Sequence, residues 1–441
     1  MKKNIKRVVA ILLAVAVLIG AGKTLRYALH DDANSYSRLL FHQFYQMDDN
    51  IDTIFVGSSH VYRSLNPVIA DDLLEANTFN LGTSGQMMDG SYAMIREACA
   101  HHDVKTVYLE LYYGIAEEPD PQDRTQNTAT YKVADYMKPS LRKLSYLLKA
   151  SSPDYYDTAF VVARRNWEKL FEESYLRHVY KSKQTDEYKN YTKTDMDEGH
   201  YYVGKGFFTN DGCAEDTYLN TLAYEPILAL DMMNEAHNWY QSIQDIVDYC
   251  RKHKIELVFF VAPEPEGTLV GKGNYAAYHD RLKDISEEMD VPLYDFNLCK
   301  PAYFDTNDRS LFLDEDHLNS KGADAFTTLF AQFFTGRISE EALFFNTFED
   351  KMMAEEPTVY GIAGFNEEVM PDQKAAFIIA NRTEGLEYRV TATPSESKEP
   401  RLIQDYSPNT AISVPKEESG TLTVEWRKSG SSEAQAFEVP Y

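Results

Sequence analysis

Two short motifs, far apart in the chain, contain the residue types that nucleophilic catalysis needs. Gly57-Ser58-Ser59 follows a short apolar run, and Asp314 stands three positions before His317. A serine becomes a nucleophile when a histidine takes its proton, while a carboxylate fixes the histidine tautomer and stabilises the imidazolium. Each motif alone is common, because Ser58 or Ser59 could merely cap a helix. Their order, with an α/β pattern between them, favours Ser59, His317 and Asp314 as nucleophile, base and orienting acid.

The residues before Ser59 predict the element that presents it. Residues 54–56 (Ile-Phe-Val) form an apolar run that is typical of a strand buried on both faces. Gly57 permits a sharp turn, because it has no Cβ that could clash. Ser59 would then lie just past the carboxyl end of a strand, which is where open α/β sheets place their ligands.

The flanking sequence predicts the rest of an α/β domain. Strands are expected at 54–56, 78–81 and 104–111, alternating with helices at 67–74 and 90–102. This alternation predicts a parallel, right-handed βαβαβ unit. The same pattern resumes at Asn234, and the segments that we expect there are a helix near 239–250, a strand at 255–262, a helix at 275–289, a strand at 291–296 and a helix that begins at Asn319 or Ser320. The fold class is therefore α/β with a doubly wound parallel sheet.

Two regions depart from this pattern. Residues from about 116 to 233 predict a helical insertion, in which the polar residues 116–127 are expected to form an exposed loop. From 346 to 441, short alternating runs separated by Pro, Ser, Glu and Gly predict a small β-sandwich that serves as a packing or a glycan-binding module. The α/β domain would thus occupy residues 31–345, with the insertion inside it.

The first 30 residues predict a membrane-directed segment. Four basic residues within the first seven positions precede an uncharged apolar run from Val8 to Gly22. Such a run fits an uncleaved anchor or a signal peptide, with anchoring favoured. The basic cluster places the amino end inside the cell and the main body outside. The protein would be secreted if the segment were cleaved.

Charge and cysteine content narrow the classes of partner. Six of the 44 Lys and Arg residues lie in the first 30 positions, so 38 remain against 69 Asp and Glu, a net charge of −31 for the body. This balance argues against binding nucleic acid through a basic surface. The four cysteines (Cys99, Cys213, Cys250 and Cys299) show no metal-ligand spacing. We therefore expect no metal and no cofactor.

These motifs together resemble the SGNH/GDSL hydrolase superfamily over roughly residues 50–335. The matching blocks are 57–59 (Gly-Ser-Ser), 80–85 (Asn-Leu-Gly-Thr-Ser-Gly) and Asp314-x-x-His317. The resemblance implies a flavodoxin-like sheet, Ser59 as the nucleophile, and the backbone N–H groups of Ser59 and Gly85 as oxyanion donors. Gly-Ser-Ser replaces the family's usual Gly-Asp-Ser, and the asparagine expected after the third strand is missing. A hydroxyl of Tyr112 or Tyr113 is a candidate for that missing donor.

The anchor, the unusual first block and the insertion resemble the acyltransferase-like branch of this superfamily. That branch includes the D-alanyl transfer protein of teichoic-acid modification and alginate O-acetylation proteins. The resemblance implies an extracytoplasmic serine acyltransferase or esterase acting on acyl esters of a cell-envelope polysaccharide. Its partners would be an acylated glycan or acyl donor and a multi-span membrane acyltransferase. The alternative is a non-catalytic glycan-binding or assembly protein on a degenerate SGNH scaffold, which the missing asparagine favours.

Overall fold

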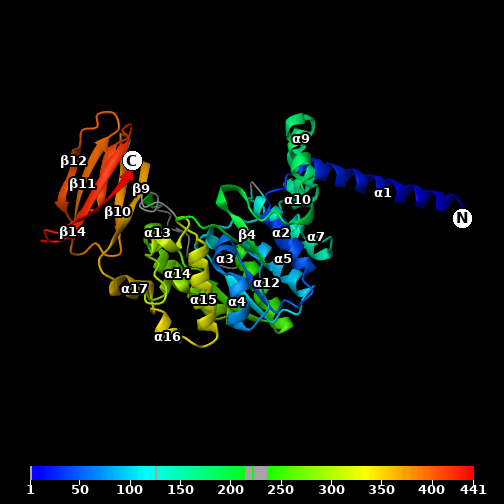
Figure 1. The fold of residues 1–441 in the computed structure, drawn as a ribbon, viewed down its shortest axis with the longest axis horizontal. Coiled ribbons are helices and arrows are strands. Elements are labelled where there is room, and N and C mark those ends of the chain that lie inside the picture. The colour runs from blue at the N-terminus through cyan, green and yellow to red at the C-terminus, as the bar shows by residue number, and fades with distance from the viewer. Residues whose placement is uncertain (1, 125–126, 214–220, 223–235, 371) are drawn as a thin grey trace.

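A computed structural model describes residues 2–124, 127–213, 221–222, 236–370 and 372–441. The chain forms an α/β body from which a long helix projects at one end and a β-rich unit extends at the other (Figure 1). The α-helices are α1 Lys2–Leu29, α2 Tyr36–Gln46, α3 Ser59–Ser64, α4 Pro67–Leu74, α5 Met88–Cys99, α6 Thr128–Ala134, α7 Leu141–Ala150, α8 Tyr156–Phe160, α9 Glu173–Ser182, α10 Asp186–Asn190, α12 Asn238–His253, α13 Glu266–Lys272, α14 Tyr275–Met289, α15 Ser320–Phe334, α16 Glu340–Leu343 and α17 Phe348–Ala354. The 3₁₀ helices are η1 Tyr113–Glu117, η2 Pro153–Tyr155, η3 Val162–Phe171, η4 Asp197–Gly199, η6 Phe296–Leu298 and η7 Arg309–Leu311.

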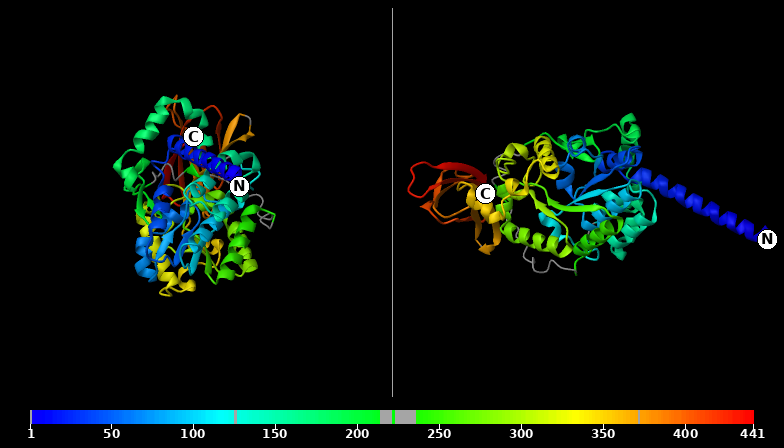
Figure 2. Two further views of the ribbon diagram at one scale, coloured as in Figure 1. Left: turned by 90° about the vertical axis from the view of Figure 1, so that its right-hand side faces the viewer. Right: turned by 90° about the horizontal axis from the view of Figure 1, so that it is seen from below.

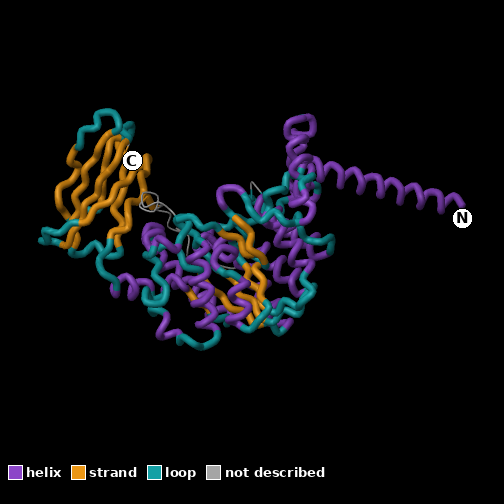
Figure 3. The backbone as a smooth tube through the Cα atoms, in the orientation of Figure 1, coloured by secondary structure: helices purple, strands orange, loops and turns teal. Residues whose placement is uncertain are grey.

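A five-stranded parallel sheet forms the centre of the body (Figure 3). Its strands are β1 Thr53–Val56, β2 Thr78–Asn80, β3 Thr106–Glu110, β7 Glu256–Val261 and β8 Leu293–Asp295. Their order is β2-β1-β3-β7-β8, which is the flavodoxin-like order 2-1-3-4-5 when the five are counted along the chain. In this order the chain switches sides between β1 and β3, and ligands bind at such switch points.

Both faces of this sheet are covered, as its unbroken apolar strands require. Ile54 and Val56 of β1 face a core that includes residues of α5, α12 and α14. Phe55, which lies between them in the strand, faces a second core with Phe326 and Phe330 of α15. Helices α4 and α15 pack against each other on that second face. The predicted fold class, a doubly wound α/β sheet, is therefore confirmed.

The region after β3 is mainly helical and returns to the sheet as a hairpin. The hairpin strands are β4 Tyr201–Gly204 and β5 Phe207–Thr209. The expectation that residues 116–127 form an exposed loop is wrong at Arg124, which is 2% exposed. Its guanidinium forms an ion pair with Asp89 of α5 at 2.7 Å and donates to the Ala150 carbonyl at 2.8 Å. Residues 214–220 and 223–235, where the insertion was predicted to end and the α/β pattern to resume, lie outside the described residues.

The C-terminal region forms two four-stranded sheets that share one apolar core. The additional strands are β6 Thr221–Leu222, β9 Val359–Met370, β10 Gln373–Ala380, β11 Leu386–Pro394, β12 Arg401–Ser407, β13 Ala411–Pro415, β14 Gly420–Lys428 and β15 Gln435–Pro440. The first sheet has the order β13-β10-β9-β6 and the second β12-β11-β14-β15. Strand β6 comes from the insertion and pairs in parallel with β9, so the two regions are joined by backbone hydrogen bonds.

The junction between the α/β body and this sandwich contains a buried ion pair. Lys351 of α17 lies 2.8 Å from Glu266 of α13, and both side chains are fully buried. The Lys351 ammonium also donates to the Asn297 carbonyl at 2.9 Å and to the Thr306 hydroxyl at 2.8 Å. Tyr360 of β9 donates to Glu266 as well. The surrounding donors and acceptors therefore satisfy both buried charges.

Helix α1 leaves the body as a single rod (Figure 2). Its stretch Leu12–Leu29 is long and apolar enough to cross a membrane. Among the α1 side chains that the structure describes, those in the last turns are the ones that the body partly covers. Asn166 and Tyr175 each donate to the Leu29 carbonyl at 2.8 Å, and Arg26 donates to the Asp135 carbonyl at 2.7 Å. The insertion therefore holds α1 by the last residues of the stretch that could span a membrane.

Candidate active site

The turn after β1 presents Ser59 as the first residue of α3. Ser58 is the N-cap of this helix, and its hydroxyl accepts from the His60 N–H at 3.2 Å. A Cβ at Gly57 would lie 2.5 Å from a Glu110 carboxylate oxygen and 2.6 Å from a Val61 methyl. Glycine is therefore required here because the turn is packed tightly, and Ser58 takes the capping role that the sequence left open between two serines.

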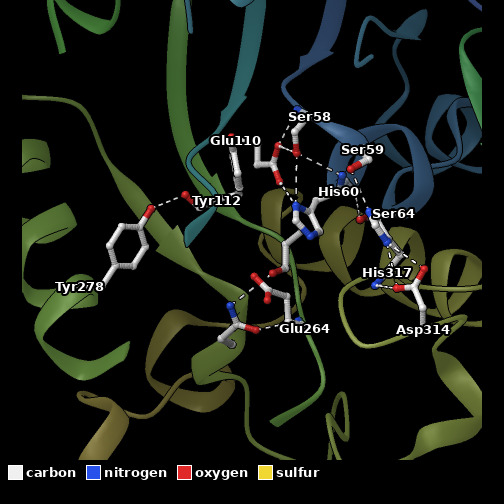
Figure 4. A network of polar contacts seen from close by, with 12 residues as sticks. Ser58, Ser59, His60, Ser64, Glu110, Tyr112, Glu264, Tyr278, Asp314 and His317 are labelled. Atoms are coloured by element: carbon white, nitrogen blue, oxygen red, sulfur yellow. Dashed lines mark hydrogen bonds and ion pairs between the residues drawn. The ribbon is translucent and has the colours of Figure 1, made fainter. Parts of the chain in front are cut away.

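The structure brings Ser59, His317 and Asp314 together in the predicted order of contacts (Figure 4). The Ser59 hydroxyl lies 2.8 Å from His317 Nε2. His317 Nδ1 lies 2.9 and 3.0 Å from the two Asp314 carboxylate oxygens. With Nδ1 protonated, Nε2 is free to accept the serine proton, which is the tautomer that general-base chemistry requires.

The loop that contains Asp314 donates two backbone hydrogen bonds to its carboxylate. Its Oδ1 accepts the backbone N–H groups of Asp316 at 2.9 Å and His317 at 2.8 Å. Burial alone would raise the pKa of Asp314, but the His317 ring and these two N–H groups outweigh burial and lower that pKa to about 2. The carboxylate therefore stays ionised, and it can stabilise a charged His317 imidazolium.

A buried carboxylate lies directly beneath the serine turn, and the sequence interpretation did not identify it. Glu110, the last residue of β3, is fully buried. It accepts the Ser58 N–H at 2.7 Å and the Ser58 hydroxyl at 2.9 Å. Glu110 thus fixes the turn between β1 and α3 from the neighbouring strand, at the switch point of the sheet. An isolated acid at the end of a predicted apolar strand was the one available signal.

His60 links this carboxylate to the histidine that contacts Ser59. Its Nδ1 lies 3.4 Å from Glu110, and its ring stacks on the His317 ring with centroids 4.9 Å apart and planes 20° apart. Burial would lower the pKa of His60, but the hydrogen bond and charge of Glu110, with Glu264 and Asp316, raise it to about 9. His60 is therefore an imidazolium at neutral pH. Its Nε2 has no hydrogen-bond partner among the described residues.

Of the two residues predicted to donate a backbone N–H to the oxyanion, Ser59 begins α3 and Gly85 lies in the loop that follows β2. The loop after β2 runs beside the serine turn, because Leu81 donates to the Phe55 carbonyl at 2.8 Å and Thr83 to the Gly57 carbonyl at 3.3 Å. Gly85 follows in this loop with a φ of +64°, a conformation that favours glycine.

The two tyrosines that follow β3 differ in what their hydroxyls contact. The Tyr113 hydroxyl donates to the Asn274 side-chain oxygen at 2.5 Å. The Tyr112 ring lies 5.7 Å from the His60 ring, and the Tyr112 carbonyl accepts from the Tyr278 hydroxyl. Both residues line the cavity described next. Of the two hydroxyls, Tyr112 is the better candidate donor, because that of Tyr113 is already used.

A cavity of about 370 Å³ opens beside these residues. His60, Tyr112, Lys272 and Asp316 are among the residues that line it. Ligand atoms of His60, Glu264 and Asp316 lie within 4.8 Å of one another, a spacing that could hold a metal ion. Glu264 already forms an ion pair with Lys272, however, so an ammonium group lies beside the same carboxylate. The cavity therefore offers mixed positive and negative groups beside His60, whose ring stacks on that of His317.

Comparisons with known proteins give no family. No family model matches the chain, and no curated protein matches it. A Bacteroides fragilis crystal structure, provisionally described as an acylhydrolase, is 11% identical and covers 66% of this chain and 91% of its own, with a TM-score of 0.29. A double mutant of a Cellulomonas fimi endo-β-1,4-mannanase is 12% identical and covers 94% and 99%, with a TM-score of 0.16. At these TM-scores neither likeness bears on fold or activity.

Proposed function

We propose that the protein is an SGNH-type serine acyltransferase or esterase. One observation carries this proposal, namely the chain of contacts from Ser59 Oγ through His317 to Asp314, at 2.8 Å and then 2.9 Å. Chance capping interactions would not align a serine, both ring nitrogens of a histidine and an ionised carboxylate in this order. The position of Ser59 after the first strand of a doubly wound sheet supports the same function.

The reaction would proceed through a covalent acyl-enzyme. The Ser59 oxygen attacks the ester carbonyl of a donor while His317 Nε2 takes the serine proton. His317 then gives that proton to the departing alcohol, and an acyl ester on Ser59 remains. An acceptor hydroxyl or water, deprotonated by His317, attacks this ester and restores free Ser59. Asp314 orients His317 and stabilises its charged form in both halves of the reaction.

The negative oxygen of each tetrahedral intermediate needs hydrogen-bond donors at about 2.7–3.1 Å. We assign this role to the backbone N–H groups of Ser59 and Gly85 and to the hydroxyl of Tyr112. The imidazolium of His60 adds a positive charge beside the reacting atoms. A site with these donors does not need the asparagine that SGNH enzymes carry after the third strand.

The substrate class follows from the location proposed for the body. If α1 spans the membrane with its basic end inside, the site lies outside the cell next to the envelope glycans. We therefore propose acyl esters on a cell-envelope polysaccharide as substrate or product, with a multi-span membrane acyltransferase as the supplier of acyl groups. Protease added to intact cells should degrade the body of the chain. Full protection of the body would contradict this location and with it the substrate class.

A fluorophosphonate probe tests the catalytic proposal directly, since it reacts with an activated serine. The wild-type protein should be labelled, Ser59→Ala should not be labelled, and His317→Ala should be labelled at least about 100-fold more slowly. Ser397→Ala, an exposed serine of the sandwich, is the matched control and should label like the wild type. If folded wild-type protein fails to label, the enzyme proposal is wrong, and the non-catalytic glycan-binding alternative gains support.

A further inference from the structure

Exposed apolar side chains are concentrated in one part of the insertion. Of the large apolar residues exposed in the described chain after α1, fourteen in all, eight lie between Leu141 and Tyr180. Phe171 is 92% exposed and Leu141 83% exposed. The eight, which we call the apolar platform, are Leu141, Leu144, Leu148, Phe160, Val161, Trp167, Phe171 and Tyr180. Scattered apolar residues need no explanation, but a concentration of this kind marks an interaction surface.

The platform lies where α1 leaves the body. Its elements are in sequential contact: α7 packs on α8, α8 on η3, and η3 on α9. Both η3 and α9 also pack on α1. Asn166, next to Trp167, donates to the Leu29 carbonyl, and Lys183, just after α9, donates to the Tyr27 carbonyl at 3.2 Å. The platform is thus attached to the last turn of the helix that could span a membrane.

The arrangement orients the platform toward the surface that α1 would enter. Figure 1 shows α9 and α7 at the end of the body from which α1 projects, with α9 running across the direction of α1. The left view of Figure 2 looks at this end, and the helices of the insertion surround the base of α1. Spanning helices tilt by only about 20° from the bilayer normal on average. If α1 spans a bilayer, the helices at its base lie next to that bilayer.

The charge of the platform suits a bilayer interface and contrasts with the rest of the chain. Residues 141–180, which span the platform, contain seven Lys or Arg and five Asp or Glu, although the whole protein has a net charge of −25. Aromatic residues alternate with these basic ones, as Trp167, Lys169 and Phe171 illustrate. Trp and Tyr favour the headgroup layer, and basic side chains are attracted to anionic lipids.

We propose that the apolar platform lies in the headgroup layer of the same bilayer that α1 spans, with Trp167 and Phe171 inserted. This inference rests on the membrane anchorage in the proposed function and adds a second, peripheral contact to it. Two contacts fix the tilt of the body, so the α/β domain cannot swing freely about α1. The active-site cavity is then held at a constant height above the membrane.

Tryptophan fluorescence tests the inference, because the chain has three tryptophans and two of them are buried. Trp239 is 1% exposed and Trp426 8% exposed, whereas Trp167 is 46% exposed. The full-length protein is reconstituted into phosphatidylcholine–phosphatidylglycerol vesicles with or without bromine on the upper acyl-chain carbons. Brominated lipid should quench the wild type, and Trp167→Phe should abolish the quenching. Phe171→Ser should weaken the quenching, whereas Phe377→Ser, an exposed phenylalanine of the sandwich, should leave it unchanged.

Flotation of the same samples separates the possible failures. If the protein floats with the vesicles but wild type and Trp167→Phe are quenched equally, α1 is anchored and the platform is not at the bilayer. That result would overturn the inference, leave the proposed location intact and point to a protein partner on this face. If the chain does not float, both the anchorage and the platform contact are wrong. Labelling of Ser59 by the fluorophosphonate probe in detergent is independent of both outcomes.

Discussion

The α/β domain should lose stability at alkaline pH, and substituting His60 with asparagine should remove this loss. His60 contacts Glu110 through Nδ1, and an asparagine amide can occupy roughly that position without carrying a charge. Burial opposes the charged ring, but Glu110, Glu264 and Asp316 raise the pKa of His60 to about 9, against 6.5 for an unperturbed histidine. The charged form is thus favoured in the folded protein.

The size and sign of the effect follow from this difference. Because the folded pKa lies above the unfolded one, the stabilisation is complete below pH 6.5 and is lost as the pH rises through 9. At 1.36 kcal/mol for each pKa unit, the lost free energy of unfolding is about 3 kcal/mol. The wild type should therefore lose about 3 kcal/mol more than His60→Asn between pH 6 and pH 9.5.

Urea unfolding at both pH values measures the effect, with the emission of Trp239 reporting on the α/β domain. Both proteins carry Trp167→Phe and Trp426→Phe, so that one buried tryptophan remains. Glu110→Gln should abolish the same pH dependence, since it removes the main charge that faces His60. Equal pH dependence in wild type and His60→Asn would refute the reasoning. If the pH dependence of stability disappears in His60→Asn but remains in Glu110→Gln, the main ion-pair partner of His60 is a carboxylate other than Glu110.

Three further predictions concern separate parts of the molecule. Lys351→Met should lower the free energy of unfolding by about 3–5 kcal/mol because it leaves a buried carboxylate unpaired, whereas Lys428→Met, at an exposed ion pair, should cost less than about 1 kcal/mol in urea unfolding. The pKa of Asp314 lies below its usual value, so its ionised carboxylate stabilises the folded protein. The difference in stability between the wild type and Asp314→Asn should be complete above pH 3.8 and should vanish as the pH falls through about 2, as thermal unfolding across this range would report. Tyr112→Phe should slow fluorophosphonate labelling by about 100-fold, and Tyr113→Phe should not; equal rates for both variants would remove Tyr112 from the oxyanion site.

The elements that the sequence predicted best are those with a strong local pattern. The helix expected at 275–289 has those bounds as α14, because its apolar positions recur at helical spacing. Trp239, Ile243, Val247 and Cys250 line the buried face of α12 for the same reason. Asn319 caps α15 by accepting from the Gly322 N–H at 3.0 Å, as its side chain suggested. Each of these features depends on residues within a few positions of one another.

The features that were missed depend on contacts between distant residues. Glu110 lies in a short strand, and nothing near it in sequence shows that its carboxylate receives the N–H of Ser58. Arg124 lies among polar residues typical of an exposed loop, and it is buried because Asp89 of α5 provides its counter-charge. The pairing of β6 with β9 joins residues of the insertion to residues of the sandwich. Local pattern cannot reveal such partners, because a buried charge or an edge strand is satisfied only by the assembled fold.

The separation of Ser59 from His317 affects the time at which this chemistry can begin. The two residues are 258 positions apart in sequence. At a synthesis rate of about 5–20 residues per second, the ribosome adds the intervening chain in about 13–50 s. During that interval Ser59 has no base and is no more reactive than an ordinary alcohol. A nascent chain therefore lacks the contact between Ser59 and His317 until the segment that carries His317 has been made and has packed on the sheet.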